Sequence, residues 1–397
     1  MSGFAPSAAT RRLTLPRPLV LDSGAVLPAV TVAYRTWGQL APGGDNAIIV
    51  CHALTGSADA DVWWSALFGP GRVLDPMEDF IVCSNVLGGC YGTSGPTSRG
   101  PDGRPWGWRF PAITIRDQVR AQMALADALG IRRIRLVIGG SMGGLQALEW
   151  ALLDPERVAA VATLAASGRH SPWCLVWSEA QRQALRADPR YRDGDYDPAD
   201  PPTAGLAAAR SIAMVSYRSA ESLARRFARQ PAAAVFGECA DDPDDFAANA
   251  WLRHHGRALV ERFDANSYRI LLEAMDTHDL ARGRGDYEDV LRGIRQPVLV
   301  GSIASDALYV PGEQRELARE IPHVTFLTIE SDHGHDGFLI DADSFQPELL
   351  AFKQQVDDPA RPDRRSPPLH LVSGCGKLPY AAEAAFGVTE PERLTRS

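Results

Sequence analysis

The sequence predicts an α/β fold in which a mostly parallel central sheet is interrupted by an inserted helical lid. Short apolar runs rich in β-branched residues alternate with amphipathic helical segments at both ends of the chain, as in successive βαβ units. Between them, the composition changes to alanine- and arginine-rich helical stretches separated by polar loops that contain proline. A chain of 397 residues that is 45% hydrophobic is long enough to bury a large core around such a sheet.

The first half of the predicted sheet comes from apolar runs typical of strands that are buried on both faces. Such runs lack the polar alternation of a strand with one face in water. They are separated by segments long enough to hold a crossover helix, which parallel neighbours require. The predicted strands of this half cover residues 47–51, 80–83, 134–138 and 158–165.

Two helices are predicted between these strands. One covers residues 116–130, where the apolar side chains share one face and Gly130 suits the end of a helix. The other begins just after Ser141 and runs to about Leu153, because Pro155 disfavours a helical residue before it. The apolar face of the first helix consists of Val119, Met123, Ala126 and Leu129.

The sheet pattern returns near residue 293. Strands are predicted at 297–301 and 323–329, and helices at 312–321 and 344–356. We therefore divide the chain into a first part of the α/β core, a helical lid insertion, a second part of the core, and a C-terminal tail of unknown role. These four segments are 1–166, 167–292, 293–356 and 357–397.

Composition narrows the class of partner. The net charge of -8 argues against broad electrostatic binding to nucleic acid or to an anionic membrane. No apolar run reaches the roughly 18 residues of a membrane span, and the N-terminal residues lack the apolar block of a signal peptide, so we predict a cytoplasmic location. The six cysteines show no C-x-x-C spacing, which favours reduced thiols over disulfides or zinc ligation. The predicted partner is a small molecule.

A short glycine-rich turn carries the first chemical signal. Residues 139–143, Gly-Gly-Ser-Met-Gly, satisfy the pattern G-x-S-x-G between a predicted strand and a predicted helix, which is the context of the nucleophile in α/β-hydrolases. A serine at such a sharp turn needs small neighbours, and it lies beside a helix N-terminus whose N–H groups can stabilise an oxyanion. Ser141 is therefore the candidate nucleophile, and Met142 would contribute one of these N–H groups.

Two other interpretations of these residues fit less well. A phosphate-binding loop would end in Gly-Lys-Ser/Thr, which is absent from this turn. The cluster His333-x-His335-Asp336 could suggest a metal site, but a His-x-His-x-Asp-His pattern would need an aspartate at Gly337. No metal ion or nicotinamide cofactor is predicted.

A nucleophilic serine of this fold needs an acidic residue and then a histidine later in the chain. Asp306 follows the predicted strand 297–301, and His333 and His335 follow the strand 323–329, so both loops open at the same sheet edge as Ser141. Spacing alone does not decide between the two histidines. His52 lies near the predicted site but precedes the serine, the wrong order for the base.

With these motifs in place, the chain resembles the homoserine O-acyltransferases of the α/β-hydrolase fold. The resemblance covers about residues 12–355, and its motifs together are highly specific. They comprise CHALTGS at 51–57, NVLGGCYGTSGPTS at 85–98, FPAITIRDQV at 110–119, GGSMGGLQALEWA at 139–151, GLAAAR at 205–210, Ser305-Asp306, and GHDGFL at 334–339.

The resemblance implies a catalytic triad of Ser141, Asp306 and His335. It also implies an oxyanion hole formed by the backbone N–H groups of Leu54 and Met142. In the implied reaction, which belongs to methionine biosynthesis, Ser141 takes an acyl group from acyl-CoA, most readily acetyl-CoA, and the γ-hydroxyl of L-homoserine then attacks the acyl-enzyme.

The same resemblance implies which residues bind the acceptor. Arg210 matches the position that holds the substrate carboxylate, and Asp336 the position that holds its ammonium group. Arg218 is a secondary candidate. The resemblance further implies a homodimer formed through the lid helices.

Several alternatives stay open at this point. Tyr91 and the stretch RGPDGRPWGW at 99–108 differ from the commonest sequence of the family at these positions. Succinyl-CoA as donor and L-serine as acceptor therefore remain alternatives. The HALTG motif at 52–56 favours homoserine over serine as the acyl acceptor. An esterase with the same triad is the second hypothesis, and a catalytically silent binding protein is the third. Which basic residues hold the CoA phosphates is not predicted.

Overall fold

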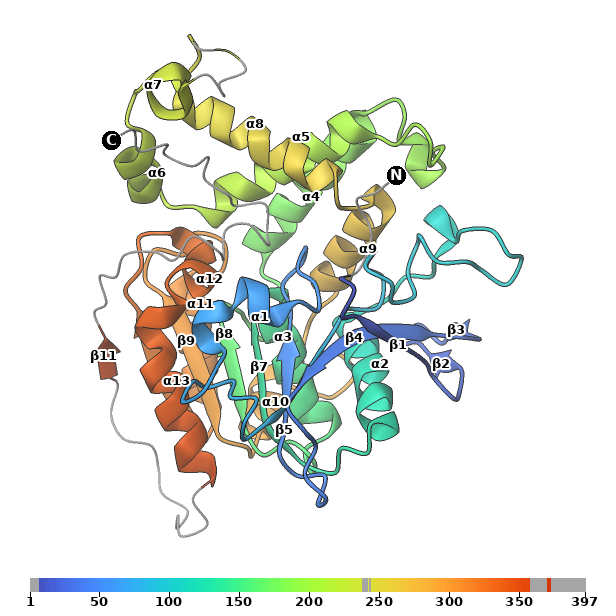
Figure 1. Ribbon diagram of the computed structural model, residues 1–397, viewed down its shortest axis with the longest axis vertical. Coiled ribbons are helices and arrows are strands. Elements are labelled where there is room, and N and C mark those ends of the chain that lie inside the picture. The colour runs from blue at the N-terminus through green and yellow to red at the C-terminus, as the bar shows by residue number, and fades with distance from the viewer. Residues whose placement is uncertain (1–6, 238–241, 243, 358–369, 373–397) are drawn as a thin grey trace.

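A computed structural model describes residues 7–237, 242, 244–357 and 370–372. Its main sheet has strand order β1-β4-β6-β5-β7-β8-β9-β10-β11 (Figure 1). The strands from β6 to β11 in this order run parallel to one another, and β4 is antiparallel to both β1 and β6. The strands are β1 (Arg11–Thr14), β4 (Thr31–Trp37), β5 (Ala47–Cys51), β6 (Phe80–Ser84), β7 (Ile134–Gly140), β8 (Val161–Leu164), β9 (Val298–Ile303), β10 (Val324–Ile329) and β11 (His370–Val372); β2 (Leu19–Val20) and β3 (Val26–Leu27) form a separate hairpin.

The parallel strands β5 through β10 are those that the sequence predicts, with small differences at their ends, whereas the parallel strand β11 falls in the predicted tail and was not predicted. β7 continues through Gly139 and Gly140 up to the serine, and β9 continues to Ile303. The antiparallel strands β1 and β4 were not predicted. β4 has the sequence TVAYRTW, in which threonine and arginine interrupt the apolar residues, and its second half is only partly buried. The sequence there contains no continuous apolar run that would predict a strand. The α/β fold with a mostly parallel sheet is confirmed.

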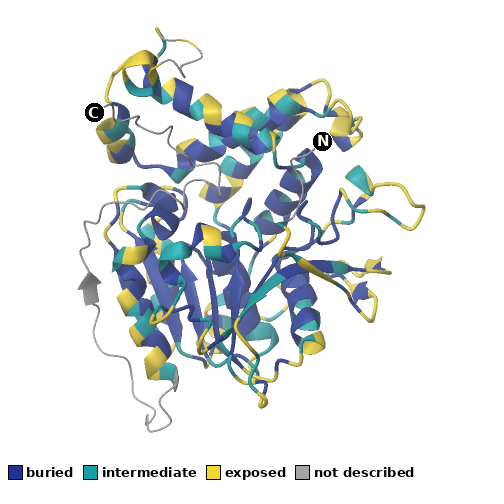
Figure 2. Ribbon diagram, viewed as in Figure 1, coloured by how far each residue is buried: buried dark blue, intermediate teal, exposed yellow. Residues whose placement is uncertain are grey.

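Helices cover both faces of the sheet because its strands are apolar on both sides. Along β5, Ala47, Ile49 and Cys51 face one hydrophobic cluster, and Ile48 and Val50 face the other. Figure 2 shows these central strands as buried and the outer helix surfaces as exposed. The helices that pack on the sheet are α1 (Ala60–Trp63), α2 (Ile115–Ala128), α3 (Met142–Leu153), α10 (Tyr287–Arg292), α11 (Pro311–Glu320), α12 (Gly337–Ile340) and α13 (Ala342–Asp357).

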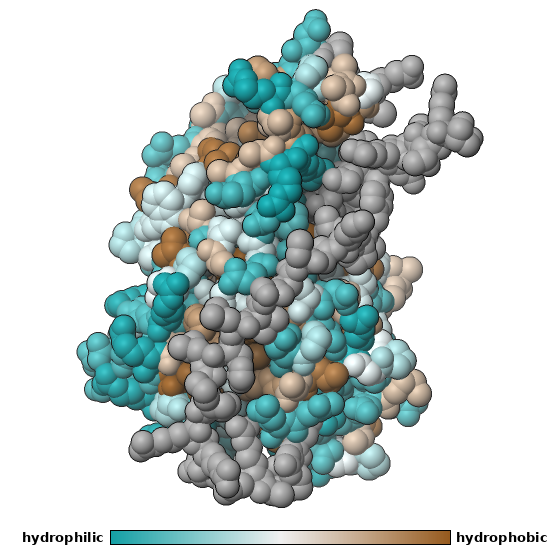
Figure 3. Space-filling model, turned by 90° about the vertical axis from the view of Figure 1, so that its left-hand side faces the viewer, coloured by the Kyte–Doolittle hydropathy of each residue, from teal (hydrophilic) through white to brown (hydrophobic). Residues whose placement is uncertain are grey.

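The segment between β8 and α10 is helical and lies over the carboxyl edge of the sheet (Figure 1). Part of it has a small hydrophobic cluster of its own, formed by Met214, Phe227, Ala247 and Trp251. Figure 3 shows hydrophobic side chains scattered among hydrophilic ones in this upper part of the molecule. Its helices are α4 (Pro172–Ala187), α5 (Thr203–Tyr217), α6 (Ala220–Phe227), α7 (Ala232–Phe236), α8 (Ala247–Val260) and α9 (Ala265–Asp276).

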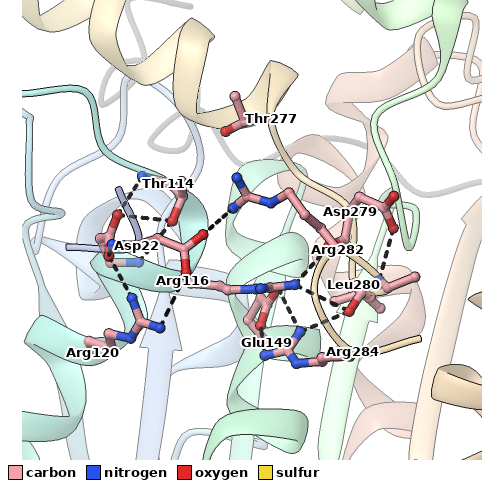
Figure 4. Close-up of polar contacts among 12 residues, drawn as sticks. Asp22, Thr114, Arg116, Arg120, Glu149, Thr277, Asp279, Leu280, Arg282 and Arg284 are labelled. Carbon is pink, nitrogen blue, oxygen red and sulfur yellow. Dashed lines mark hydrogen bonds and ion pairs between the residues drawn. The ribbon is translucent and has the colours of Figure 1, made fainter. Parts of the chain in front are cut away.

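A buried ion-pair cluster ties the segment after α9 to the core (Figure 4). Glu149 of α3 accepts from Arg116 Nε of α2 at 3.0 Å and from Arg284 Nη2 at 2.7 Å. Arg116 Nη2 also donates to the Asp279 carbonyl at 3.0 Å. Nearby, Arg282 pairs with Asp22 at 2.5 Å. These contacts fix the return of the chain from the lid against the helix that follows Ser141.

Three further sequence predictions concern the cysteines, the C-terminal tail and membrane-spanning helices. Cys51, Cys83, Cys90 and Cys174 are buried and free, as predicted, whereas Cys239 and Cys375 lie outside the described residues. Apart from the end of α13 and strand β11, the predicted tail 357–397 also lies outside them. Of the helices described, none is both long and apolar enough to cross a membrane.

Candidate active site

Ser141 occupies a strained turn between β7 and α3. Its backbone has φ 57° and ψ -128°, a conformation that costs a non-glycine residue on the order of 1–3 kcal/mol. The turn also demands close backbone approach, since a Cβ on Gly143 would lie 2.1 Å from the Cys51 carbonyl oxygen and one on Gly140 would lie 2.3 Å from the Phe338 ring. The glycines of the motif are therefore required by packing, as the sequence predicts.

The structure brings Ser141, His335 and Asp306 into one hydrogen-bonded row. His335 Nε2 lies 2.8 Å from Ser141 Oγ, and His335 Nδ1 lies 2.7 Å from Asp306 Oδ2. The other Asp306 oxygen accepts from the backbone N–H groups of Leu308 and Tyr309, at 2.8 and 3.0 Å. Because Asp306 can only accept, the neutral imidazole carries its proton on Nδ1 and leaves Nε2 free to accept from the serine hydroxyl.

The environment of His335 sets its basicity. Burial lowers the pKa of the imidazole, but the charge of Asp306 and its hydrogen bond raise it, as does the charge of Asp336, so the net pKa lies above the usual 6.5. The ring is also surrounded by aromatic side chains, with centroids 5.5 to 5.6 Å away. These are Tyr217, Tyr309 and Phe338.

His333, the alternative left open by spacing, points elsewhere. Its Nδ1 lies 3.2 Å from Arg218 Nη1 and 3.4 Å from Ser222 Oγ, both in the lid. The two imidazoles of the His-x-His cluster therefore have separate sets of partners. Within the described residues, no group of three His, Cys, Asp or Glu side chains gathers as metal ligands would.

The residues implied for acceptor binding lie beside the triad. Arg210 of α5 and Asp336 line one pocket together with Ser141, His335 and Tyr217. Arg210 is buried, and its guanidinium carbon lies 5.3 Å from the centroid of the Tyr217 ring. The secondary candidate Arg218 ion-pairs with Asp336, with 3.3 Å between Nε and Oδ2. The pocket therefore presents a buried cation and a buried anion within reach of the serine.

The two implied oxyanion donors approach the serine from different elements. Met142 is the first residue of α3, so its N–H has no carbonyl one turn earlier to bind. Leu54 lies in the turn after β5, and it lines the same pocket as Ser141. The space enclosed there is about 20 Å³, enough for one water molecule, so an amino acid can enter only if lining groups move.

Comparison with known proteins gives this geometry a family. A family profile described as alpha/beta hydrolase fold matches residues 46–342. The curated homoserine O-acetyltransferase of Trichormus variabilis is 53% identical over 351 residues, which span 88% of this chain and 95% of that protein. The chain belongs to the homoserine O-acyltransferase family of the α/β-hydrolase fold.

Solved structures agree with this membership. The homoserine O-acetyltransferase of Staphylococcus aureus is 28% identical with a TM-score of 0.71, over 89% of this chain and 97% of that one. The structure of esterase E22 is 25% identical with a TM-score of 0.77, over 88% of this chain and 99% of that one. The family fold is thus shared with proteins named for acyl transfer and with proteins named for ester hydrolysis.

The structure shows what Tyr91 and the stretch 99–108, which differ from the commonest family sequence, contact. Tyr91 Oη accepts from Arg262 Nη1 at 2.7 Å, and the same nitrogen donates to the Thr55 carbonyl at 2.8 Å. The stretch 99–108 borders a cavity of about 1000 Å³ together with the lid. Tyr91 is therefore linked through Arg262 to Thr55, which lines the pocket at Ser141, and neither departure includes a triad residue.

Sequence reasoning missed several residues that surround the site. The aromatic residues around His335 carry no motif of their own, although Tyr217 adjoins Arg218. Arg262 belongs to the lid, where many arginines are solvated and none stands out. His52 belongs to the HALTG motif, but its position before the serine in the chain excluded it only as the general base and indicated no other role. Each of these residues acquires its partners through contacts between distant parts of the chain.

Proposed function

We propose that this protein transfers an acyl group from acyl-CoA to the γ-hydroxyl of L-homoserine through an acyl-Ser141 intermediate. Acetyl-CoA is the favoured donor, because the related proteins are named homoserine O-acetyltransferases. One observation carries the proposal: the buried Arg210 and Asp336 line the same pocket as Ser141 and His335, which form a hydrogen-bonded row with Asp306.

In the first half-reaction, His335 Nε2 accepts the proton of Ser141 as Oγ attacks the thioester carbonyl. The N–H groups of Leu54 and Met142 stabilise the oxyanion that forms, and Asp306 stabilises the imidazolium. The proton on Nε2 then passes to the sulfur of CoA, which leaves as the thiol. An ester on Ser141 results, and the imidazole is neutral again.

In the second half-reaction, homoserine occupies the pocket. Arg210 binds its carboxylate, and Asp336 binds its ammonium group, so that its hydroxyl lies near His335 Nε2. The imidazole takes the hydroxyl proton as the oxygen attacks the acyl carbon, and it returns a proton to Ser141 Oγ as the ester product departs. No cofactor beyond the acyl-CoA co-substrate is required.

Burial of the reacting groups favours transfer over hydrolysis. Ser141, Asp306 and His335 are at most 6% exposed, which limits the access of bulk water to an acyl-serine. An esterase is the second candidate, because esterase E22 has the same fold. The two candidates differ in whether water or a bound amino acid captures the acyl group.

A matrix of donors and acceptors tests the proposal. Thiol release is measured with acetyl-CoA or succinyl-CoA against L-homoserine or L-serine, and each product is identified by mass. We expect release from acetyl-CoA only when homoserine is present. Equal release without any amino acid would identify a hydrolase, and a faster reaction of another pair would reassign the substrates.

Three broader expectations accompany this function. We expect the acylated homoserine to serve methionine biosynthesis, the protein to be cytoplasmic, and two copies to associate through the lid. Exposed apolar residues on α4, among them Trp173 and Val176, are consistent with a contact there. Light scattering that gives the mass of one chain would reject the dimer.

A further inference from the structure

The HALTG turn contains a histidine that the mechanism above leaves without a role. His52 follows strand β5 and is 2% exposed. The next three residues, Ala53, Leu54 and Thr55, line the pocket beside Ser141. A polar ring that is so deeply buried needs hydrogen-bond partners. One partner of His52 lies in the same turn, and the other lies in the loop after β6.

The hydrogen bonds of His52 fix its tautomer. The backbone N–H of Val86 donates to His52 Nε2 at 3.1 Å, so Nε2 must accept. A neutral imidazole then has its proton on Nδ1, and Nδ1 lies 2.7 Å from the Ala53 carbonyl oxygen. Burial lowers the pKa of His52 to about 4, which keeps the ring neutral near pH 7.

The Ala53 carbonyl is thereby held from two sides. It accepts from His52 Nδ1 and from the backbone N–H of Gly56, at 2.9 Å. In a trans peptide the C=O of one residue and the N–H of the next point in opposite directions. Holding the Ala53 oxygen therefore fixes the direction of the Leu54 N–H. Within the described part of the chain, that N–H donates to no protein acceptor.

The turn is also tied to the helix that supplies the second donor. Gln146 Nε2 donates to the His52 carbonyl at 3.3 Å and to the Met142 carbonyl at 3.1 Å. Gln146 is fully buried, and its oxygen accepts from Gln122 at 2.7 Å. One side chain thus connects the residue before the turn with the first residue of α3.

We propose that His52 is a positioning residue for the oxyanion hole. Its Nδ1–H holds the Ala53–Leu54 peptide so that the Leu54 N–H faces the oxyanion formed at Ser141. This inference rests on the proposed function in that it takes Leu54 as an oxyanion donor. Loss of one such donor costs an enzyme of this kind about 10²- to 10³-fold in kcat, and a donor that is merely less constrained costs less.

Two nearly isosteric variants separate the two bonds of the ring. In His52→Asn, the amide nitrogen can take the place of Nδ1 and still donate to Ala53, but the acceptor for Val86 is lost. In His52→Gln, the amide oxygen can take the place of Nε2 and accept from Val86, but the donor to Ala53 is lost. We expect His52→Gln to lower kcat about tenfold or more, and His52→Asn to retain most of it.

A second readout isolates the oxyanion. A trifluoromethyl ketone that adds to Ser141 forms a stable tetrahedral oxyanion, so its affinity should fall across the variants in parallel with kcat/KM. The KM for homoserine should not change. His278→Gln is the control: His278 is 4% exposed and is also neutral, since burial lowers its pKa to about 3, and it lies in the segment after α9.

The inference is overturned if His52→Gln is as active as the unaltered protein or as His52→Asn, or if inhibitor affinity is the same in both. It is also overturned if His278→Gln loses kcat to the same extent. Acylation by p-nitrophenyl acetate is followed in the same variants. If thiol release never depends on an amino acid, the proposed function fails, whereas the ester and inhibitor data still decide the role of His52.

Discussion

The catalytic groups and the groups proposed to bind the acceptor differ in how the molecule holds them. Ser141 directly follows β7, and Asp306 and His335 lie in the loops after the parallel strands β9 and β10. The His335 ring contacts Tyr309 of one large cluster and Phe338 of the other. Arg210 and Tyr217 lie on α5, whose buried apolar residues are shared between one of the large clusters and the small cluster of the lid. Because α5 is buried along one face only and the central strands are buried almost throughout, displacing this helix exposes less apolar surface than displacing a strand.

This difference assigns separate tasks to the two regions. A strained serine and a buried row of hydrogen bonds need a rigid support, which the sheet provides. Entry of an amino acid into a pocket of about 20 Å³ needs movement, which the lid can provide at lower cost. Reactivity should therefore depend on the core and acceptor selectivity on the lid, and variants can test that division.

The largest effect is expected at the centre of the core. Ser141→Ala should lower kcat by more than about 10⁴-fold, because no nucleophile is left to form the acyl-enzyme. Thiol release from acetyl-CoA measures the loss, and thermal unfolding should show an intact fold. Ser302→Ala, which removes a buried serine from β9, serves as the control. Undiminished turnover of Ser141→Ala would end both enzymatic hypotheses.

The next effect concerns the anchor between the two regions. Glu149→Gln leaves Arg116 and Arg284 without the carboxylate that both contact, and it should lower the free energy of unfolding by about 3–5 kcal/mol. Urea denaturation measures it. Asp343→Asn, at an exposed pair with Arg72, should cost at most about 1 kcal/mol. Equal costs would mean that the buried cluster is not an anchor.

A smaller effect is expected in the lid. Arg210→Met should lower kcat/KM for homoserine about 10²-fold, because the substrate carboxylate loses a buried cation, and Arg210→Lys should lose less. Acylation by p-nitrophenyl acetate should change only a few-fold. Arg225→Met removes an exposed lid arginine and should leave both rates unchanged. If both reactions of Arg210→Met fall equally, the division between core and lid is wrong.

The smallest effect is a shift along the pH axis. His335 acts as a base only when neutral, so kcat/KM should fall as the pH drops through its pKa, and the midpoint should lie above 6.5 because Asp306 raises that pKa. In Asp306→Asn the raising charge is gone, and any residual activity should extend to lower pH. An acid limb with its midpoint below 6.5 in the unaltered protein would contradict this account.

Local patterns were sufficient for the elements that dominate the fold. The apolar runs at β5, β7 and β9 are buried on both faces, so each one reveals a strand without reference to its neighbours. β4 is only partly apolar, and it was missed. Ser141 was found because a sharp strand-to-helix turn imposes glycines within two residues of it, which is a constraint visible in the sequence.

The sequence by itself determined the parallel sheet, the position of the strained serine, and the loops in which an acid and a base had to lie. Residue spacing left His333 and His335 open and the family resemblance favoured His335, and the tertiary structure shows that His335 is the one that meets Ser141. Only the tertiary structure decided that Arg218 pairs with Asp336 and that His52 Nδ1 bonds the Ala53 carbonyl. The physical reason is distance along the chain. Hydrogen bonds between side chains as far apart as Ser141 and His335 depend on the stacking of whole strands and helices, and no local pattern of residues encodes that stacking.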